Sequence, residues 1–144
     1  ERFCELTGSK PDYQALRHAA ADIFWVNAPI VPLVTGLMSA GQRLGILSNT
    51  NDIHWDHVQR HYAFVAEGFD VYALSHELKS MKPAPEIYQR AAELAGVAPA
   101  EVFFVDDRRE NVDGALAAGF DAVLYTSAHR LALDLSERGV PNNY

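Results

Sequence analysis

The sequence is poor in cysteine, in basic residues and in long apolar runs, and each shortage argues against a class of protein. Its only cysteine, Cys4, has no second cysteine to pair with in the chain, which excludes a disulfide scaffold and suits a reducing compartment. The 12 Lys and Arg residues are outnumbered by 19 Asp and Glu, and they form no run, which argues against binding to nucleic acid. No apolar run reaches the ~20 residues of a membrane span. We therefore expect a cytoplasmic protein that binds neither nucleic acid nor membrane.

What remains is the composition of an ordinary globular domain: 144 residues, of which 49% are hydrophobic and 22% are charged. From residue 43 onward, predicted strands and helices alternate. The strands are predicted at 43–48, 69–75, 101–107 and 121–126, and the helices at about 52–62, 84–96, 109–119 and 127–139. Near-continuous apolar strands separated by helices are typical of a parallel sheet with helices on both faces. The sequence therefore predicts an α/β fold.

The first 40 residues carry a different pattern, which is helical only. Residues 12–25 have apolar residues at helical spacing, and Asn27 with Pro29 can open a second helix that runs to about Ala40 and stops at Gly41. This part is predicted to be a separate unit or the remnant of one.

Polar residues gather where the predicted strands end, and the carboxyl ends of parallel strands are where ligands bind in open α/β sheets. They are Ser48, Asn49 and Thr50 after the first strand, Ser75 with the later Lys79 and Lys82 after the second, Asp106 and Asp107 after the third, and Thr126 and Ser127 after the fourth. Hydroxyls, an amide, a lysine and a carboxylate pair suit a phosphate group and a divalent metal ion.

Each of these features also has a purely structural explanation. Residues 48–50 could cap the following helix, Ser127 is expected to cap the last helix, and Lys82 could be an exposed turn lysine. One aspartate could cap the helix that follows it, but two adjacent carboxylates at a buried strand end repel each other. A hard cation with oxygen ligands removes that repulsion, and Mg²⁺ often uses one or two carboxylates together with water and phosphate. Asp106 and Asp107 therefore favour a magnesium site.

Three histidines, His54, His57 and His61, share one face of the helix predicted at 52–62. Neither cysteine nor a fixed carboxylate accompanies them, so we interpret them as a surface histidine face beside Trp55 rather than as a metal site.

Three segments in order, "GILSNT", "KSMKPAPEIY" and "FFVDDRRENVDGALAAG", closely resemble motifs two, three and four of the haloacid-dehalogenase-like (HAD) hydrolase superfamily. Within it, the chain resembles the small phosphatases with a helical cap inserted after the first strand, and in particular the branch that acts on sugar phosphates such as α-glucose-1-phosphate. The resemblance implies a Rossmann-like HAD core over residues 27–144, and the end of the helical cap over residues 1–26.

The resemblance implies roles for three residues around a phosphoryl group. Ser48 would donate a hydrogen bond to it, helped by the backbone amide of Asn49. Lys82 would neutralise phosphate charge and hold the carboxylate of the nucleophile. Positioning and charge neutralisation are most of what phosphoryl transfer requires.

The resemblance also assigns the acidic residues. Asp107 would bind Mg²⁺ directly, and Asp106 would bind it through water or orient the site. Asn111 would support the acidic loop, while Asp113 would face solvent. Family members that cleave carbon–halogen bonds work without a metal and have no comparable use for such a pair, so a phosphatase is favoured over a dehalogenase.

The family's first motif, an apolar strand that ends in two aspartates one residue apart, is not found in this chain. Those aspartates are the nucleophile and the general acid–base. Asp22, Asp70 and Asp121 each lack a second Asp two residues on. We therefore expect motif one upstream of Glu1, within about 40 to 60 further residues.

The strand of motif one would lie centrally, between the strands at 43–48 and 101–107, and its absence would leave two apolar edges. We expect this chain alone to be poorly stable, or to pair with a second copy or with the missing N-terminal segment.

The sequence thus predicts an Mg²⁺-dependent hydrolase of a small phosphorylated metabolite, acting through an aspartyl-phosphate, here as a fragment without its nucleophile. The alternative is a non-catalytic HAD-like module that binds phosphorylated ligands or partners. A dehalogenase or a phosphomutase is less favoured.

Overall fold

The computed structural model describes residues 2–8, 12, 15–16, 19, 23 and 25–142. Most of the helix predicted at 12–25 lies outside these residues, although a short helix, α1 (Arg2–Thr7), precedes it. The other helices of the described residues are η1 (Ala28–Ile30), α3 (Val31–Ser39), α4 (Asp52–His61), α5 (Ala63–Glu67), α6 (Ser75–Leu78), α7 (Pro85–Ala95), η2 (Pro99–Glu101), α8 (Arg109–Ala117) and α9 (Ala128–Glu137). None of the helices in these ranges combines the length and the apolar character that crossing a bilayer requires.

All four predicted strands are present, and they pair in parallel as the α/β pattern predicts. They are β1 (Gly45–Ser48), β2 (Val71–Leu74), β3 (Phe103–Asp106) and β4 (Asp121–Leu124). Strand β1 pairs with β2, with Ser48 opposite Leu74, and β3 pairs with β4, with Asp106 opposite Leu124. The result is two two-stranded sheets, and within the described part of the chain β1 and β3 are not paired with each other. That a further strand belongs between them stays a prediction.

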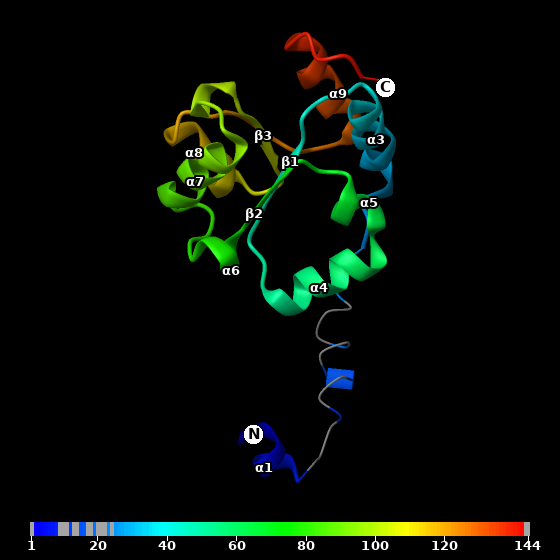
Figure 1. Cartoon of the computed structure of the whole chain (residues 1–144), viewed down its shortest axis with the longest axis vertical. Helices are drawn as coiled ribbons and strands as arrows, with labels where there is room; N and C mark the ends of the chain where they lie inside the picture. Colours follow the sequence, from blue (N-terminus) through cyan, green and yellow to red (C-terminus); the bar gives the residue numbers. More distant parts are fainter. Residues whose placement is uncertain are drawn as a thin grey trace.

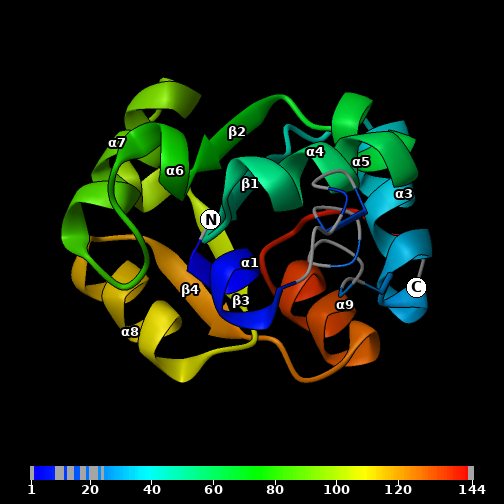
Figure 2. The same ribbon diagram turned by 90° about the horizontal axis from the view of Figure 1, so that it is seen from below.

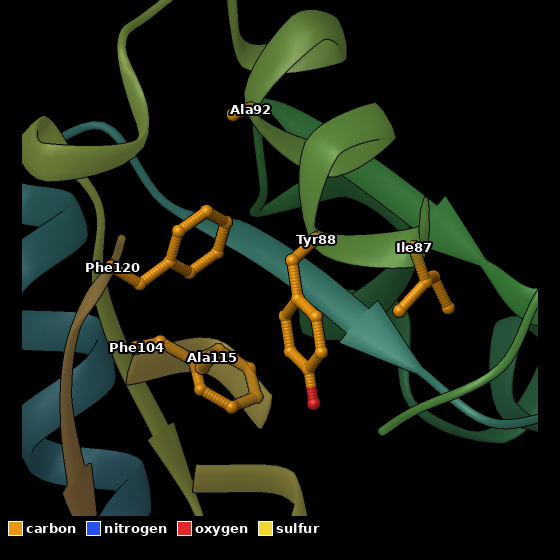
Figure 3. Packing of buried hydrophobic residues seen from close by; sticks show 6 residues of the cluster. All are labelled: Ile87, Tyr88, Ala92, Phe104, Ala115 and Phe120. Carbon is orange, nitrogen blue, oxygen red and sulfur yellow. The ribbon is translucent and has the colours of Figure 1, made fainter. Parts of the chain in front are cut away.

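Helices α7 and α8 cover one face of these strands (Figure 1). Their buried side chains form a first core with β3 and the segment before β4, made of Ile87, Tyr88, Ala92, Phe104, Ala115 and Phe120. Figure 3 shows three of its aromatic rings packed around one another. The ring centroids of Tyr88 lie 5.9 Å from Phe104 and 5.7 Å from Phe120, both in the edge-to-face geometry that aromatic pairs favour.

Helices α3 and α9 cover the opposite face, as Figure 2 shows from below. Their buried side chains form a second core, made of Leu33, Leu37, Leu131, Ala132 and Leu135, on which Phe103 and Val105 pack. Phe104 faces the first core while Phe103 and Val105 face the second, because successive side chains of a strand point to opposite faces. Strand β3 is therefore covered on both sides, as its unbroken apolar sequence predicts.

The predicted helix at 52–62 is interrupted. Helix α4 ends at His61, and Tyr62, with φ −129° and ψ 73°, separates it from α5. Neither Gly nor Pro marks this break in the sequence. The strand predicted to reach residue 75 ends at Leu74 instead, and Ser75 begins helix α6.

Candidate active site

Lys82 lies in the loop between α6 and α7, and its side chain reaches the ends of two strands that do not pair. Its Nζ donates a 2.8 Å hydrogen bond to the carbonyl oxygen of Leu47 in β1 and a 2.6 Å hydrogen bond to Oδ2 of Asp106 in β3. The Lys82 side chain is only 9% exposed, so its interpretation as an exposed turn lysine is wrong. One buried cation thus lies where β1 and β3 both end.

Asp106 is held by three hydrogen bonds from the protein. Besides Lys82 on Oδ2, its Oδ1 accepts a hydrogen bond of 2.9 Å from Asn111 Nδ2 and another of 2.9 Å from the backbone N–H of Arg108. Burial alone would raise the pKa of Asp106, but the hydrogen bonds from Lys82, Asn111 and Arg108 outweigh it and hold this pKa below its ordinary value. Asp106 is therefore an ionised, fixed carboxylate at neutral pH.

Asp107 differs from its neighbour in that its side chain is exposed. No group of three His, Cys, Asp or Glu side chains in the described ranges could hold a metal ion by itself. A pair of adjacent carboxylates nevertheless fits Mg²⁺, which is commonly held by one or two carboxylates, with water and phosphate as its other ligands. Asp107 could bind such an ion directly, and Asp106 could orient the site from behind it.

Asn111 connects this acidic loop to the first core. It is buried in α8, and its backbone carbonyl oxygen accepts a 2.7 Å hydrogen bond from the hydroxyl of Tyr88. Burial, and secondarily the charge of Asp106, raises the pKa of Tyr88 to about 12. The expected support of the acidic loop by Asn111 is confirmed, and so is the exposure of Asp113. The part played by Tyr88 was not predicted, because nothing in "PEIY" separates a hydroxyl that supports a site from an ordinary core tyrosine.

The loop after β1 is held by contacts with the loop of Lys82 and with the start of α6. The side chain of Asn49 hydrogen-bonds the backbone of Lys82, and the hydroxyl of Ser75 hydrogen-bonds the backbone of Thr50. The cap of α4 is Asn51, whose Oδ1 accepts the N–H of His54, so residues 48–50 are not the cap. The contacts of Asn49 with Lys82 and of Lys82 with Asp106 thus join the end of β1, at Ser48, to the end of β3.

Other polar residues at the strand ends have structural roles. Ser127 caps α9 as predicted, since its Oγ accepts the N–H of Arg130 at 3.1 Å. Asp106 is not the cap of α8 either: Arg108 is the N-cap residue there, and Asp106 bonds the N–H of Arg108 instead.

The prediction that the three histidines form a surface face is wrong at His57. His57 is only 8% exposed, and its ring stacks on that of His61 with the centroids 4.1 Å apart. The ring of Tyr62 also lies edge-on to His57, with the centroids 6.5 Å apart.

Comparison with known proteins identifies relatives of this arrangement. A family model described as haloacid dehalogenase-like hydrolase matches residues 6–119. Phosphoglycolate phosphatase of Escherichia coli is 33% identical over 78 residues, which are 53% of this chain and 31% of that protein. The chain spans less than half the length of the curated relatives that it matches.

Two crystal structures extend the comparison to the fold. A HAD family enzyme of Bacteroides thetaiotaomicron, in complex with magnesium and inorganic phosphate, is 29% identical with a TM-score of 0.75, over 86% of this chain and 65% of that one. A dehalogenase is 35% identical with a TM-score of 0.58, over 63% of this chain and 40% of that one.

Proposed function

Because the chain belongs to the haloacid dehalogenase-like hydrolase family, we propose that it is the core of an Mg²⁺-dependent phosphomonoester hydrolase. The observation that carries the proposal is the buried pair of Lys82 and Asp106 at the ends of β1 and β3, with the exposed carboxylate of Asp107 beside it. A buried cation next to two carboxylates is what a phosphate with a bound Mg²⁺ requires.

In this proposal Ser48 donates a hydrogen bond to the phosphoryl group, and the backbone amide of Asn49 donates another. Lys82 neutralises the charge that develops in transfer, in a site where its own charge is already partly buried. Asp107 holds Mg²⁺ directly and Asp106 orients the site. The metal ion, when bound, supplies further neutralisation of the phosphate oxygens.

The nucleophile that forms the aspartyl-phosphate is proposed to come from a segment upstream of residue 1, so that this chain alone is inactive. The proposed substrate is a small phosphorylated metabolite, with sugar phosphates favoured by the resemblance of the motifs. Phosphoglycolate phosphatase, by its name, acts on a small phosphorylated acid. We also propose that the protein is located in the cytoplasm.

A dehalogenase is the second candidate, because one relative of known structure carries that name. The adjacent aspartates oppose it, since carbon–halogen cleavage in this family has no comparable use for a metal-binding carboxylate pair. A phosphomutase or a non-catalytic phosphate-binding module would share the geometry of Lys82 and Asp106, so only an activity assay separates them from the hydrolase.

The test is hydrolysis of p-nitrophenyl phosphate, with Mg²⁺ and with EDTA, by the chain alone and by the chain joined to its upstream segment. We expect metal-dependent activity only in the longer protein. We also expect Lys82→Ala to lower it about 10²-fold or more, because it removes a charge at the transferring group. Asp107→Ala should abolish the Mg²⁺-dependent hydrolysis. Asp113→Ala, which removes an exposed carboxylate of the following helix, should leave the rate unchanged.

Each other outcome identifies a competing function. Release of chloride from a 2-haloacid without metal would establish the dehalogenase. Phosphate binding without turnover in the longer protein would favour the non-catalytic module.

A further inference from the structure

The side chain of Asn49 forms a two-point contact with the backbone of Lys82, 33 residues further along the chain. Its Oδ1 accepts the N–H of Lys82 at 2.7 Å, and its Nδ2 donates to the carbonyl oxygen of Lys82 at 2.9 Å. A planar amide that both accepts from and donates to one residue restrains the position and the rotation of that residue's backbone. Asn49 therefore holds the point from which the Lys82 side chain starts.

The loop that carries Asn49 is itself held at the next residue, Thr50. The Ser75 hydroxyl donates to the carbonyl oxygen of Thr50 and accepts the N–H of Thr50, both at 2.9 Å. Ser75 is buried at the start of α6. Asn49 thus attaches the loop of Lys82 to a loop that is itself held in place by hydrogen bonds.

Lys82 needs such a restraint, because its ammonium must meet two acceptors on different strands. The carbonyl oxygen of Leu47 belongs to β1 and the carboxylate of Asp106 to β3, and the two strands are not joined by a ladder of hydrogen bonds. A lysine side chain is a flexible four-carbon stem, so a mobile backbone would let the ammonium leave one of the two acceptors.

We propose that Asn49 is a positioning residue, whose side chain holds Lys82 against Leu47 and Asp106 while its backbone amide serves the phosphoryl group. The part of this inference that concerns catalysis rests on the proposed function. The side-chain oxygen and one hydrogen of the side-chain amide of Asn49 are already used by Lys82, which favours this role over direct contact between the side chain and substrate.

The experiment measures how accessible the Lys82 ammonium is, and it needs no turnover. The chain is treated briefly with an amine-acetylating reagent and cut after glutamate, which releases one peptide, residues 78–86, that contains both Lys79 and Lys82. Fragment masses then give the labelling of Lys82 relative to the exposed Lys79 in the same molecule. Hydrogen exchange at the amide of Lys82 is followed by NMR in untreated samples of the same proteins.

In the Asn49→Ala variant we expect labelling of Lys82 relative to Lys79 to rise about fivefold or more, the factor that corresponds to one net hydrogen bond. The amide of Lys82 should exchange faster by a similar factor. Asn49→Asp keeps the acceptor for the N–H but loses the donor to the carbonyl, so its values should lie between those of the native chain and of Asn49→Ala.

The matched control is Asn51→Ala, which removes an asparagine two residues away and costs stability through the lost helix cap without touching Lys82. It should leave the labelling ratio unchanged. An unchanged ratio in Asn49→Ala, or an equal rise in Asn51→Ala, would overturn the positioning role. Because these readouts need no hydrolysis, a lack of activity in the chain joined to its upstream segment would refute the proposed function and leave this result standing.

Discussion

Lys82 and Asp106 form an ion pair whose Nζ and Oδ2 atoms lie 2.6 Å apart, with only 9% and 7% of the two side chains exposed. Such a pair has lost most of its contact with water, so each charge depends on the other for compensation. Its effect on stability is therefore asymmetric: removal of both charges is tolerated far better than removal of one.

The first prediction follows from that asymmetry. Lys82→Met should lower the free energy of unfolding by about 3 kcal/mol, because the Asp106 carboxylate stays buried without its cation. The double variant Lys82→Met with Asp106→Asn should recover part of this loss. Urea denaturation at neutral pH measures both, and Lys79→Met, at an exposed lysine three residues away, should stay within about 0.5 kcal/mol of the native chain. Equal losses in the single and the double variant would contradict the burial of the pair.

The second prediction concerns Asp107 and the metal ion. Mg²⁺ should raise the melting temperature of the native chain, since a ligand that binds only the folded state stabilises it. Asp107→Asn should abolish this rise and leave the metal-free melting temperature nearly unchanged, because its side chain is exposed. Asp113→Asn is the matched control and should keep the response to Mg²⁺. If Asp107→Asn responded to Mg²⁺ as the native chain does, residues other than Asp107 would have to be the metal ligands.

The third prediction is a pH dependence that arises from Tyr88. Its pKa is about 12 in the folded chain against an ordinary 10.0, so the folded state keeps a proton that the unfolded state releases. Between those values the unfolded state binds fewer protons, and stability must therefore fall as the pH rises from about 10 to about 12. The loss is on the order of 2 kcal/mol.

Tyr88→Phe should remove that part of the pH dependence. At neutral pH the same variant should cost about 1–3 kcal/mol, because the carbonyl oxygen of Asn111 loses its buried donor. Urea denaturation at pH 7 and from pH 9.5 to 12 measures both effects. If the two chains lost stability in parallel above pH 10, the titration would belong to another group.

The fourth prediction concerns the contact between α8 and the loop of Lys82. A Cβ added at Gly114 would lie 2.9 Å from the carbonyl oxygen of Pro83 and 2.9 Å from the Tyr88 hydroxyl. The Pro83 oxygen belongs to the backbone, and the Tyr88 side chain is fully buried and hydrogen-bonded, so Gly114→Ala should push the loop away and cost about 1–3 kcal/mol. Asp113→Ala, an exposed neighbour in the same helix, should be nearly neutral. Thermal denaturation of the two variants provides the comparison.

The elements of the fold were predictable because their sequences carry local signals. The apolar run at 103–105 and the helix from Pro85 to Ala95, which a glycine ends, are visible in the sequence and present in the structure. Boundaries set by distant contacts were not predictable. Helix α6 begins at Ser75, whose hydroxyl forms hydrogen bonds with the backbone of Thr50 in the loop after β1.

The candidate site also has features that the sequence predicts and features that it does not. That Ser48, Lys82 and Asp106 would share one edge follows from strands that run in parallel. That Asn49 would hold the Lys82 backbone does not follow from the sequence, because the contact joins residues 33 positions apart. His57 was misjudged because a helix with few apolar residues resembles a surface helix, and the packing of the His61 and Tyr62 rings against His57 carries no local signal.

The two separate sheets have a consequence for how the chain melts. Strands β3 and β4 carry helix α8, while β1 and β2 are joined to them by side-chain packing in the cores and by the hydrogen bonds of Lys82 to Leu47 and Asp106, rather than by a ladder of backbone hydrogen bonds. Heat can thus separate the halves before either one melts. The calorimetric enthalpy of unfolding should then exceed the van't Hoff enthalpy, and the edge where both halves meet should lose its geometry first.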